Sequence, residues 1–375
     1  MRPRYISTSR GAWEIGLIFS QTGRLANVGT SQLEGAILAI DEINAAGGIN
    51  GLPLSPVIRD DGSDPQRFLY LSDLMLREEV INIVFGGSSP EARRTAAPMF
   101  EHRNGLLFYS GLGDGFDFSP NVFCFGLLPN QACGRVLREA CRAEAKETFV
   151  LHRDDLLSRG LGDCLAREIE RMGGTILGEA TVSDQPADIA TALARLEVSH
   201  AAVVFLMMGG SDAGAILKAL QSGGRRPKVI AFATCEKDLA PLAGAAVGVL
   251  TVSTYCSAVA SPVAEAFNAR FTRRYGRAAS PDVFCEASYC AVCLFALSLR
   301  HTGSVETDVI GDAIPGMSLH GPQGQVTMDP ESNAAALWPR VLRWGPDSRF
   351  EIVVESDRAM MPDPFLIAHS DGGPF

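Results

Sequence analysis

The chain has 375 residues, of which 46% are hydrophobic and 20% are charged. This length exceeds the roughly 100–200 residues of one ordinary domain, so we expect two domains of a globular α/β protein and not a disordered or fibrous chain. The formal net charge of -10 disfavours direct nucleic-acid binding, which needs cations that neutralise phosphates. The longest apolar runs are about half as long as the ~20 residues that span a membrane, so we expect no membrane insertion.

The N-terminus lacks an apolar stretch followed by a small-residue cleavage site. We therefore predict a cytoplasmic protein, with the periplasm as the alternative if a native signal was removed and Met1 is not the native start. The chain has nine cysteines, and an odd number argues against a disulfide framework. No metal site and no cofactor are predicted, and reduced, mostly buried thiols are expected.

Short apolar runs alternate with stretches in which apolar residues recur at helical spacing. Such alternation predicts parallel sheets built from right-handed βαβ units. The predicted strands cover residues 13–20, 54–59, 81–85, 106–109, 149–151, 175–181, 201–207, 229–233 and 248–252, and β structure is also expected at 324–328 and within 341–354. The predicted helices include residues 65–78, 160–171, 189–196, 214–222, 263–275 and 281–301.

No low-complexity linker divides the chain, which favours two lobes joined by several short crossovers and closing by a hinge motion. We place the crossovers near residues 123–128, 252–255 and 325–328. The predicted fold is therefore α/β, with two Rossmann-like lobes whose parallel sheets are joined by three crossovers. Lobe 1 comprises residues 1–124 and 255–324, and lobe 2 comprises residues 125–254 and 325–375.

Four stretches carry a resemblance to a known family. They are IGLIFSQTG with EGAILAIDEINAAGGINGLPL, then VFGGSSPEARRTAAPMFEHRNGLLFY, then GFDFSPNVFCFGLLPNQ, and finally GPQGQV with PDPFLIAHS. Together they resemble the type I periplasmic-binding-protein superfamily (periplasmic binding protein-like I) over residues 15–370. The chain looks most similar to the amide-sensing regulators of aliphatic amidase operons and to the urea and branched-chain amino acid binding proteins of ABC transporters.

The resemblance implies a protein without catalysis that closes on a small polar ligand, and it suggests ligand positions in lobe 1. Ser88 and Ser89 follow a predicted strand and precede a helix, a place where polar ligands collect at the helix N-terminus. The same two serines also fit a helix cap with its capping carboxylate. Tyr109, Ser110 and Gly111 follow the next strand, although a strand-end tyrosine also fits a core position.

Lobe 2 is expected to supply the remaining ligand contacts. Glu236 is the candidate partner for a ligand ammonium, or alternatively an acidic residue stabilised at a helix N-terminus. Asp154 lies in a loop after a predicted strand, where a surface position is the competing interpretation. The other predicted ligand residues are Met207, Gly209 and Thr234 in this lobe, and Tyr255 at the second crossover.

At positions where the amide sensors carry tyrosines and a threonine, this chain carries Gly87, Gly111 and Leu156. We therefore expect a roomier and less aromatic pocket.

Three functions are weighed. The first is a ligand-responsive regulator that acts on a protein partner, and a homodimer is also considered. The second is the solute-binding component of an ABC importer, which docks on a permease. The third is an amide or ester hydrolase with Ser88 or Ser89 as nucleophile, which the absence of a GxSxG elbow disfavours.

Overall fold

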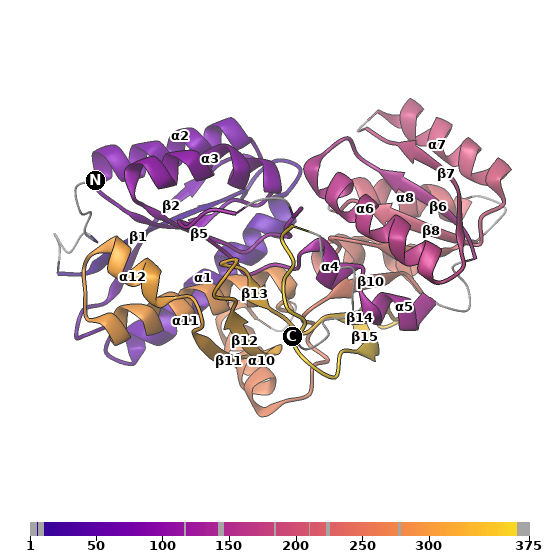
Figure 1. Ribbon diagram of the computed structural model, residues 1–375. Helices are drawn as coiled ribbons and strands as arrows, with labels where there is room; N and C mark the ends of the chain where they lie inside the picture. The colour runs from indigo at the N-terminus through magenta and orange to yellow at the C-terminus, as the bar shows by residue number, and fades with distance from the viewer. Residues whose placement is uncertain are drawn as a thin grey trace.

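The computed structural model describes residue 6 and residues 11–115, 118–141, 146–183, 185–209, 211–222, 226–276 and 279–365. Two sheets with their helices form two lobes that lie side by side (Figure 1). The predicted α/β fold with parallel sheets and three connections between lobes is confirmed.

The first lobe is built on a five-stranded parallel sheet in the order β2-β1-β3-β4-β5. Its strands are β1 (Trp13–Phe19), β2 (Leu54–Asp60), β3 (Ile83–Gly86), β4 (Leu106–Tyr109) and β5 (Val122–Cys124). Its helices are α1 (Ala26–Ala45), α2 (Pro65–Leu74, continued by a π turn over Met75–Glu79), α3 (Pro90–Arg103), α10 (Pro262–Tyr275), α11 (Val283–Thr302) and α12 (Thr307–Ala313). Helices α2 and α3 cover one face of the sheet, and α1 and α11 cover the other (Figure 1).

The second lobe is built on a seven-stranded sheet in the order β15-β14-β10-β9-β8-β6-β7. Its strands are β6 (Glu147–His152), β7 (Thr175–Thr181), β8 (Val203–Met207), β9 (Lys228–Ala231), β10 (Leu250–Ser253), β14 (Arg340–Trp344) and β15 (Phe350–Glu355). Its helices are α4 (Pro129–Ala132), α5 (Arg135–Cys141), α6 (Leu156–Arg171), α7 (Pro186–Ser199), α8 (Ser211–Ser222) and α9 (Glu236–Leu239), with a 3₁₀ helix over Ala240–Ala246. The last two strands, β14 and β15, are antiparallel to their neighbours.

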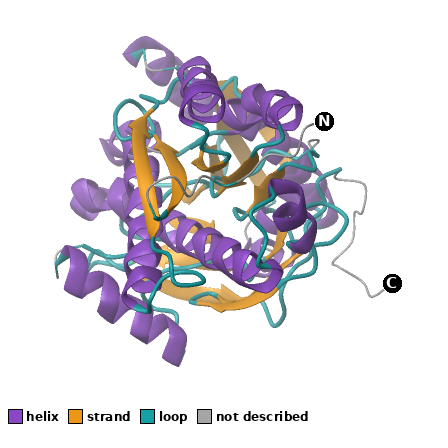
Figure 2. Ribbon diagram, turned by 90° about the vertical axis from the view of Figure 1, so that its left-hand side faces the viewer, coloured by secondary structure: helices purple, strands orange, loops and turns teal. Residues whose placement is uncertain are grey.

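Helices lie on both sides of the strands, as the view from the first-lobe end shows (Figure 2). In the second lobe, alternate strand residues face opposite layers, as strand geometry requires. Phe205 packs in the core that α5 and α6 cover, whereas Val204 and Leu206 pack in the core that α7 and α8 cover. Helices thus cover both faces of this sheet. A ligand can therefore reach the sheet at the ends of its strands.

Helix α11 is long and apolar enough to cross a membrane, but 83% of its most apolar stretch is buried inside the protein. Asp282 caps the helix by accepting hydrogen bonds from the N–H groups of Phe284 and Cys285. Gly35 of α1 lets the two helices approach closely, since a Cβ there would lie 1.9 Å from the Cys285 carbonyl oxygen. The apolar composition of α11 is therefore that of a helix in the protein core.

The nine cysteines are free thiols, and eight of them are buried. Cys290 and Cys293 stand in a CxxC spacing on α11, and burial raises the pKa of both thiols. A buried thiol with a raised pKa is unreactive. These cysteines therefore behave as small core residues.

A third, three-stranded sheet changes one predicted connection. It contains β11 (Ser318–Gly321), β12 (Gly324–Met328) and β13 (Ala335–Ala336), all antiparallel. The predicted crossover at residues 325–328 is wrong, because these residues form β12 and the chain reaches the second lobe only between β13 and β14. The assignment of residues to lobes stays a prediction, with its boundary between residues 324 and 325 falling inside this hairpin.

Candidate functional site

A small cavity lies between the lobes, next to residues that follow the carboxyl ends of strands from both sheets. Its volume is about 40 Å³. This is room for a few water molecules and is smaller than an amino acid. The residues that line it are Arg24, Leu25, Val28, Ser88, Ser89, Pro90, Glu91, Leu112 and Phe284 from the first lobe, and Asp155, Leu157, Met208, Gly209 and Ala233 from the second. A ligand therefore needs the lobes to move apart before it can enter.

The two predicted serines of the first lobe both line this cavity, but their hydroxyls already have partners. Ser89 is the N-cap of α3 and accepts a hydrogen bond from the Ala92 N–H at 3.2 Å. The buried Ser88 hydroxyl donates to Gln32 Oε1 at 2.8 Å and accepts from the Ser20 N–H. Neither hydroxyl is hydrogen-bonded to a histidine in the described residues. The pair thus forms a positioned helix N-terminus and not a nucleophile with its base.

Gln32 extends this network to a third predicted residue. Its Nε2 donates to the Ser110 hydroxyl at 3.1 Å, and Ser110 is buried. Ser88, Gln32 and Ser110 thus form a buried chain of hydrogen bonds beneath the cavity. Ser110 does not line the cavity, but it accepts a hydrogen bond from Gln32, which in turn accepts one from the lining residue Ser88.

Tyr109 and Gly111 form a core contact in this structure. Tyr109 is fully buried, and its hydroxyl donates to the Leu112 carbonyl at 2.6 Å. A Cβ on Gly111 would lie 2.6 Å from that hydroxyl oxygen. Glycine at 111 thus makes room for the tyrosine, and neither residue lines the cavity. Of the two interpretations of Tyr109, ligand contact or core residue, its position in this structure matches the core residue.

Three of the residues predicted in the second half of the chain, Met207, Thr234 and Tyr255, also lie in the core. Met207 is buried in β8, and its carbonyl accepts from the Ser158 hydroxyl at 2.6 Å. The hydroxyl of buried Thr234 donates to the Phe232 carbonyl. Tyr255 is buried against Phe267, with its hydroxyl donating to Asn268. Of the second-lobe predictions, only Gly209 lines the cavity, where a Cβ would lie 2.0 Å from the Ala233 carbonyl oxygen.

Asp154 lies on the surface, and its neighbour Asp155 lies at the cavity. The Asp154 side chain is 76% exposed and forms an ion pair with Arg159 at 2.6 Å. Asp155 is the N-cap of α6 and accepts from the Ser158 N–H at 2.8 Å. Asp154 therefore occupies the surface position that was its competing interpretation. The aspartate that lines the cavity is the next residue, Asp155.

Polar groups join the lobes directly on either side of the cavity. Glu91 of α3 accepts a hydrogen bond from the Leu156 N–H of α6 at 2.8 Å. Asn27 of α1 donates to Asp238 of α9 at 2.8 Å. These contacts, together with the Lys237–Glu34 ion pair at 2.6 Å, hold the lobes in a closed arrangement.

Glu236 stands at the start of α9 beside two other acidic residues, Asp238 and Asp282. Part of the residue reaches solvent, but its Oε1 is buried and has no hydrogen-bond partner in the described part of the chain. Burial, with the negative charge of Asp282, raises the pKa of the Glu236 carboxyl well above its usual range. A buried carboxylate without a partner is costly, and a cation placed there would offset this cost.

The expectation of a pocket roomier and less aromatic than that of the amide sensors stays a prediction. In the closed arrangement the cavity is small, and Phe284 is the one aromatic side chain among the described lining residues. Leu156 contributes its backbone N–H to Glu91, and Gly87 adopts a positive φ of 77° after β3. Glycine at 87 is therefore explained by backbone conformation.

Sequence reasoning missed most of the lining residues. Arg24, Leu25 and Val28 come from the start of α1, and Leu112 and Phe284 come from distant parts of the chain. All but Arg24 are apolar, and apolar residues at a helix start or in a loop signal core packing as readily as a ligand wall. The TGRLANVG stretch, inside the motif that carries the resemblance, was the available signal for α1.

Comparison with known proteins decides the family. The model of the periplasmic binding protein domain matches residues 13–371. The chain belongs to the periplasmic binding protein family. Among curated relatives, the leucine-, isoleucine-, valine-, threonine- and alanine-binding protein of Pseudomonas aeruginosa is 21% identical over 348 residues, 89% of this chain and 90% of that protein.

Solved structures share the fold of this periplasmic binding protein. A solute-binding protein of an ABC transporter from Rhodopseudomonas palustris, in complex with 3,4-dihydroxybenzoic acid, has a TM-score of 0.85 at 20% identity and covers 94% of this chain and 99% of its own. A branched-chain amino acid transporter substrate-binding protein from Streptococcus pneumoniae, in complex with isoleucine, has a TM-score of 0.81 at 20% identity, with 92% and 99% covered.

These relatives support a solute-binding component of an ABC importer, the second function predicted from the sequence, better than the ligand-responsive regulator that was predicted first. The resemblance to the wider family is confirmed, whereas special closeness to the amide-sensing regulators is not shown. Likewise, a periplasmic location fits the periplasmic binding protein family better than the predicted cytoplasmic one. For this periplasmic binding protein, no comparison points to catalysis.

Proposed function

We propose that the chain is the solute-binding component of an ABC importer and that it captures an amino acid with an apolar side chain between its lobes. The observation that carries this proposal is the cavity between the lobes. There, the N-terminus of α3 faces apolar side chains. Glu236, three residues after the lining residue Ala233, has a carboxylate oxygen without a hydrogen-bond partner among the described residues. Membership of the periplasmic binding protein family and the amino-acid-binding relatives support it.

Each part of an amino acid has a counterpart in this arrangement. The ligand carboxylate binds at the N-terminus of α3, where helix N–H groups and the helix dipole favour an anion. The ammonium binds Glu236 once the lobes have opened and closed again around the ligand. The side chain contacts the apolar wall formed by Leu25, Val28 and Phe284.

An aromatic carboxylic acid is the second candidate ligand. Several solved structures with this fold are complexes with benzoate or hydroxybenzoates. Leu112, Leu157 and Met208 add apolar surface to the wall that Phe284 begins. Such a ligand uses the α3 N-terminus and the apolar wall but has no ammonium for Glu236.

Calorimetric titration with isoleucine, 4-hydroxybenzoate, acetamide and urea separates the candidates. We expect isoleucine to bind, and Glu236→Gln to weaken it at least about tenfold, because a hydrogen bond to a charged group contributes ~1.5–3 kcal/mol. Asp154→Asn is the matched control, since that carboxylate is exposed and ion-paired outside the cavity. Tight binding of 4-hydroxybenzoate that is unchanged by Glu236→Gln identifies the aromatic acid instead. Binding of none of the four contradicts the proposal.

An importer component also has to be exported and to meet a permease. Fractionation of the native host should find the protein outside the cytoplasmic membrane. Recovery in the cytoplasm together with a protein partner would favour the regulator instead.

A further inference from the structure

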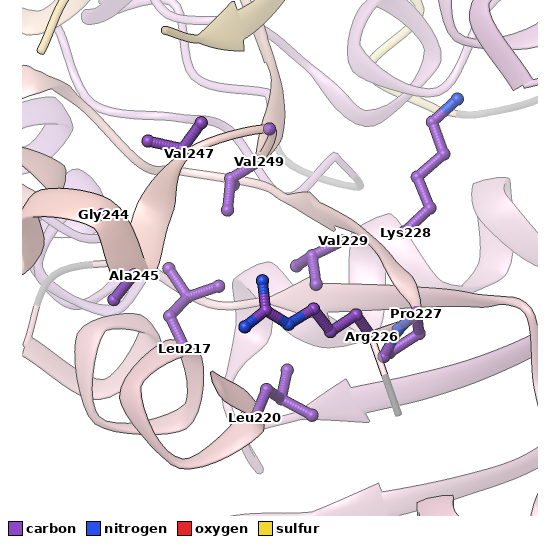
Figure 3. A pocket seen from close by; sticks show the side chains of 11 residues that line it. Leu217, Leu220, Arg226, Pro227, Lys228, Val229, Gly244, Ala245, Val247 and Val249 are labelled. Atoms are coloured by element: carbon purple, nitrogen blue, oxygen red, sulfur yellow. The ribbon is translucent and has the colours of Figure 1, made fainter. Parts of the chain in front are cut away.

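A second pocket lies in the second lobe (Figure 3), and its described lining residues differ from those of the cavity between the lobes. Its volume is about 550 Å³, within the ~300–1,000 Å³ range of small-molecule sites. The lining residues come from α8, the start of β9 with the two residues before it, the 3₁₀ helix, and the turn between that helix and β10. They are Leu217, Leu220, Arg226, Pro227, Lys228, Val229, Gly244, Ala245, Val247, Gly248 and Val249.

Aliphatic side chains form most of this wall. Leu217, Val229 and Val249 belong to the buried core of the lobe, and Leu220 packs against that core. The exposed part of the wall comes from Val247, which is 47% exposed, and from the half-buried Leu220, Pro227 and Ala245. The pocket therefore exposes aliphatic surface that an apolar ligand would cover.

Arg226 supplies the polar group of the pocket. Its guanidinium lies among Leu217, Leu220 and Val229 (Figure 3). No aspartate or glutamate is among the lining residues described above, although the whole chain carries a net charge of -10. Lys228 points elsewhere and donates to the Ala140 carbonyl at 3.4 Å. Among the described lining residues, Arg226 thus supplies the charge that faces the pocket.

The backbone of the wall offers few further donors. The N–H of Lys228 donates to Ala202, that of Gly248 to Trp344, and that of Val249 to Ala246. Pro227 has no N–H. Because these groups are already paired, a ligand rich in hydroxyls or amides would leave its own polar atoms without partners, whereas an aliphatic chain with one anionic end would not.

The pocket and the cavity lie at opposite ends of β9. Lys228 and Val229, at the amino end of the strand, line the pocket, whereas Ala233, beyond its carboxyl end, lines the cavity. None of the described residues lines both. A ligand in the pocket therefore does not compete directly with one between the lobes.

We propose that this pocket is a second binding site, for a medium-chain aliphatic monocarboxylate. The carboxylate pairs with the Arg226 guanidinium, which suits planar two-point contact. The hydrocarbon chain lies on Leu220, Ala245 and Val247. This inference goes beyond the proposed transport role and does not depend on it.

Decanoate, used below its micelle-forming concentration, is the probe. Equilibrium dialysis and calorimetry should show one saturable site whose affinity is unchanged by saturating isoleucine or 4-hydroxybenzoate. Arg226→Gln should weaken binding at least tenfold, and Val247→Asp should do the same by placing a carboxylate at the wall. Arg273→Gln, an exposed arginine on α10, is the control and should bind decanoate like the unmodified protein.

Three results would overturn the site. They are the absence of saturable decanoate binding, equal affinity in the Arg226→Gln and Arg273→Gln variants, and displacement of decanoate by the cleft ligands. Decanol, which has the chain without the charge, should bind at least tenfold more weakly than decanoate. Equal binding of decanol would show that Arg226 contributes nothing. Thermal unfolding of each variant verifies that the lobe remains folded.

Discussion

The guanidinium of Arg340 donates a hydrogen bond to the carbonyl of Thr254, and so joins two of the three connections between the lobes. The same side chain donates to the Gln323 carbonyl at 2.9 Å and pairs with Glu355. Arg340 is buried. The Arg340 side chain thus holds these two connections at a fixed distance from each other. The connections are the segments that must bend when the lobes open or close.

Arg340→Lys should lower the free energy of unfolding by about 1–3 kcal/mol, because a lysine cannot serve all of these acceptors and buried acceptors without donors are costly. Urea denaturation followed by circular dichroism measures the change. Arg343→Lys is the control, since its ion pair with Glu351 is exposed and should change stability by less than ~1 kcal/mol. Equal losses in the two variants would contradict a special role of the Arg340 contacts.

Glu91 should favour the closed arrangement, because it accepts the Leu156 N–H from the other lobe. We expect Glu91→Ala to make the ligand-free protein more open than the unmodified protein and to weaken ligand affinity by about tenfold, the effect of one hydrogen bond to a charged group. Energy transfer between one dye on each lobe reports opening, and calorimetry reports affinity. Glu101→Ala on the same helix is the control. A ligand-free Glu91→Ala protein that is no more open than the unmodified one would contradict the expectation.

Stability should depend on pH through Glu236. Its folded-state pKa lies above the ordinary value of 4.5 because of burial and Asp282. A raised carboxyl pKa contributes stability that is fully present below pH 4.5 and is lost as the pH rises through the folded-state value. Without ligand, the unmodified protein should therefore lose more stability than Glu236→Gln between pH 4.5 and pH 7. Parallel profiles of unfolding free energy against pH would refute this.

Gly209→Ala should damage the site, because the new Cβ would lie 2.0 Å from the Ala233 carbonyl oxygen and backbone cannot easily move aside. We expect ligand affinity to fall at least tenfold, with a lower melting temperature. Gly162→Ala on α6 meets nothing within 4 Å and should stabilise the protein by about 0.5–1 kcal/mol. If Gly209→Ala binds ligand normally, the close contact between these two loops is not needed for binding.

The fold was predictable because its strands are continuous apolar runs separated by helical periodicity, as both sheets show. The position of the third connection could not be predicted. Residues 325–328 would form a strand whether they crossed between the lobes or stayed in a separate sheet, and only their pairing with β11 and β13 shows that the chain crosses later. The start of α6 was missed by four residues, since the Asp155 cap lies before the glycine at which the predicted helix begins.

The site was less predictable than the fold. Ser88, Ser89 and Gly209 were found because strand ends and helix N-termini can be located from periodicity. Tyr109 could not be assigned, because its partner is the Leu112 carbonyl, whose position depends on how the following loop folds. Asp154 and Asp155 are chemically alike, and only the cap geometry of α6 separates the exposed side chain from the one at the cavity.

Small-angle X-ray scattering with and without saturating isoleucine, or another ligand that calorimetry identifies, tests most directly whether ligand is captured between the lobes. A protein that opens to admit ligand and closes around it should show a smaller radius of gyration when saturated, and the saturated profile should match the closed arrangement described above. An identical profile with and without bound ligand would contradict capture by lobe closure.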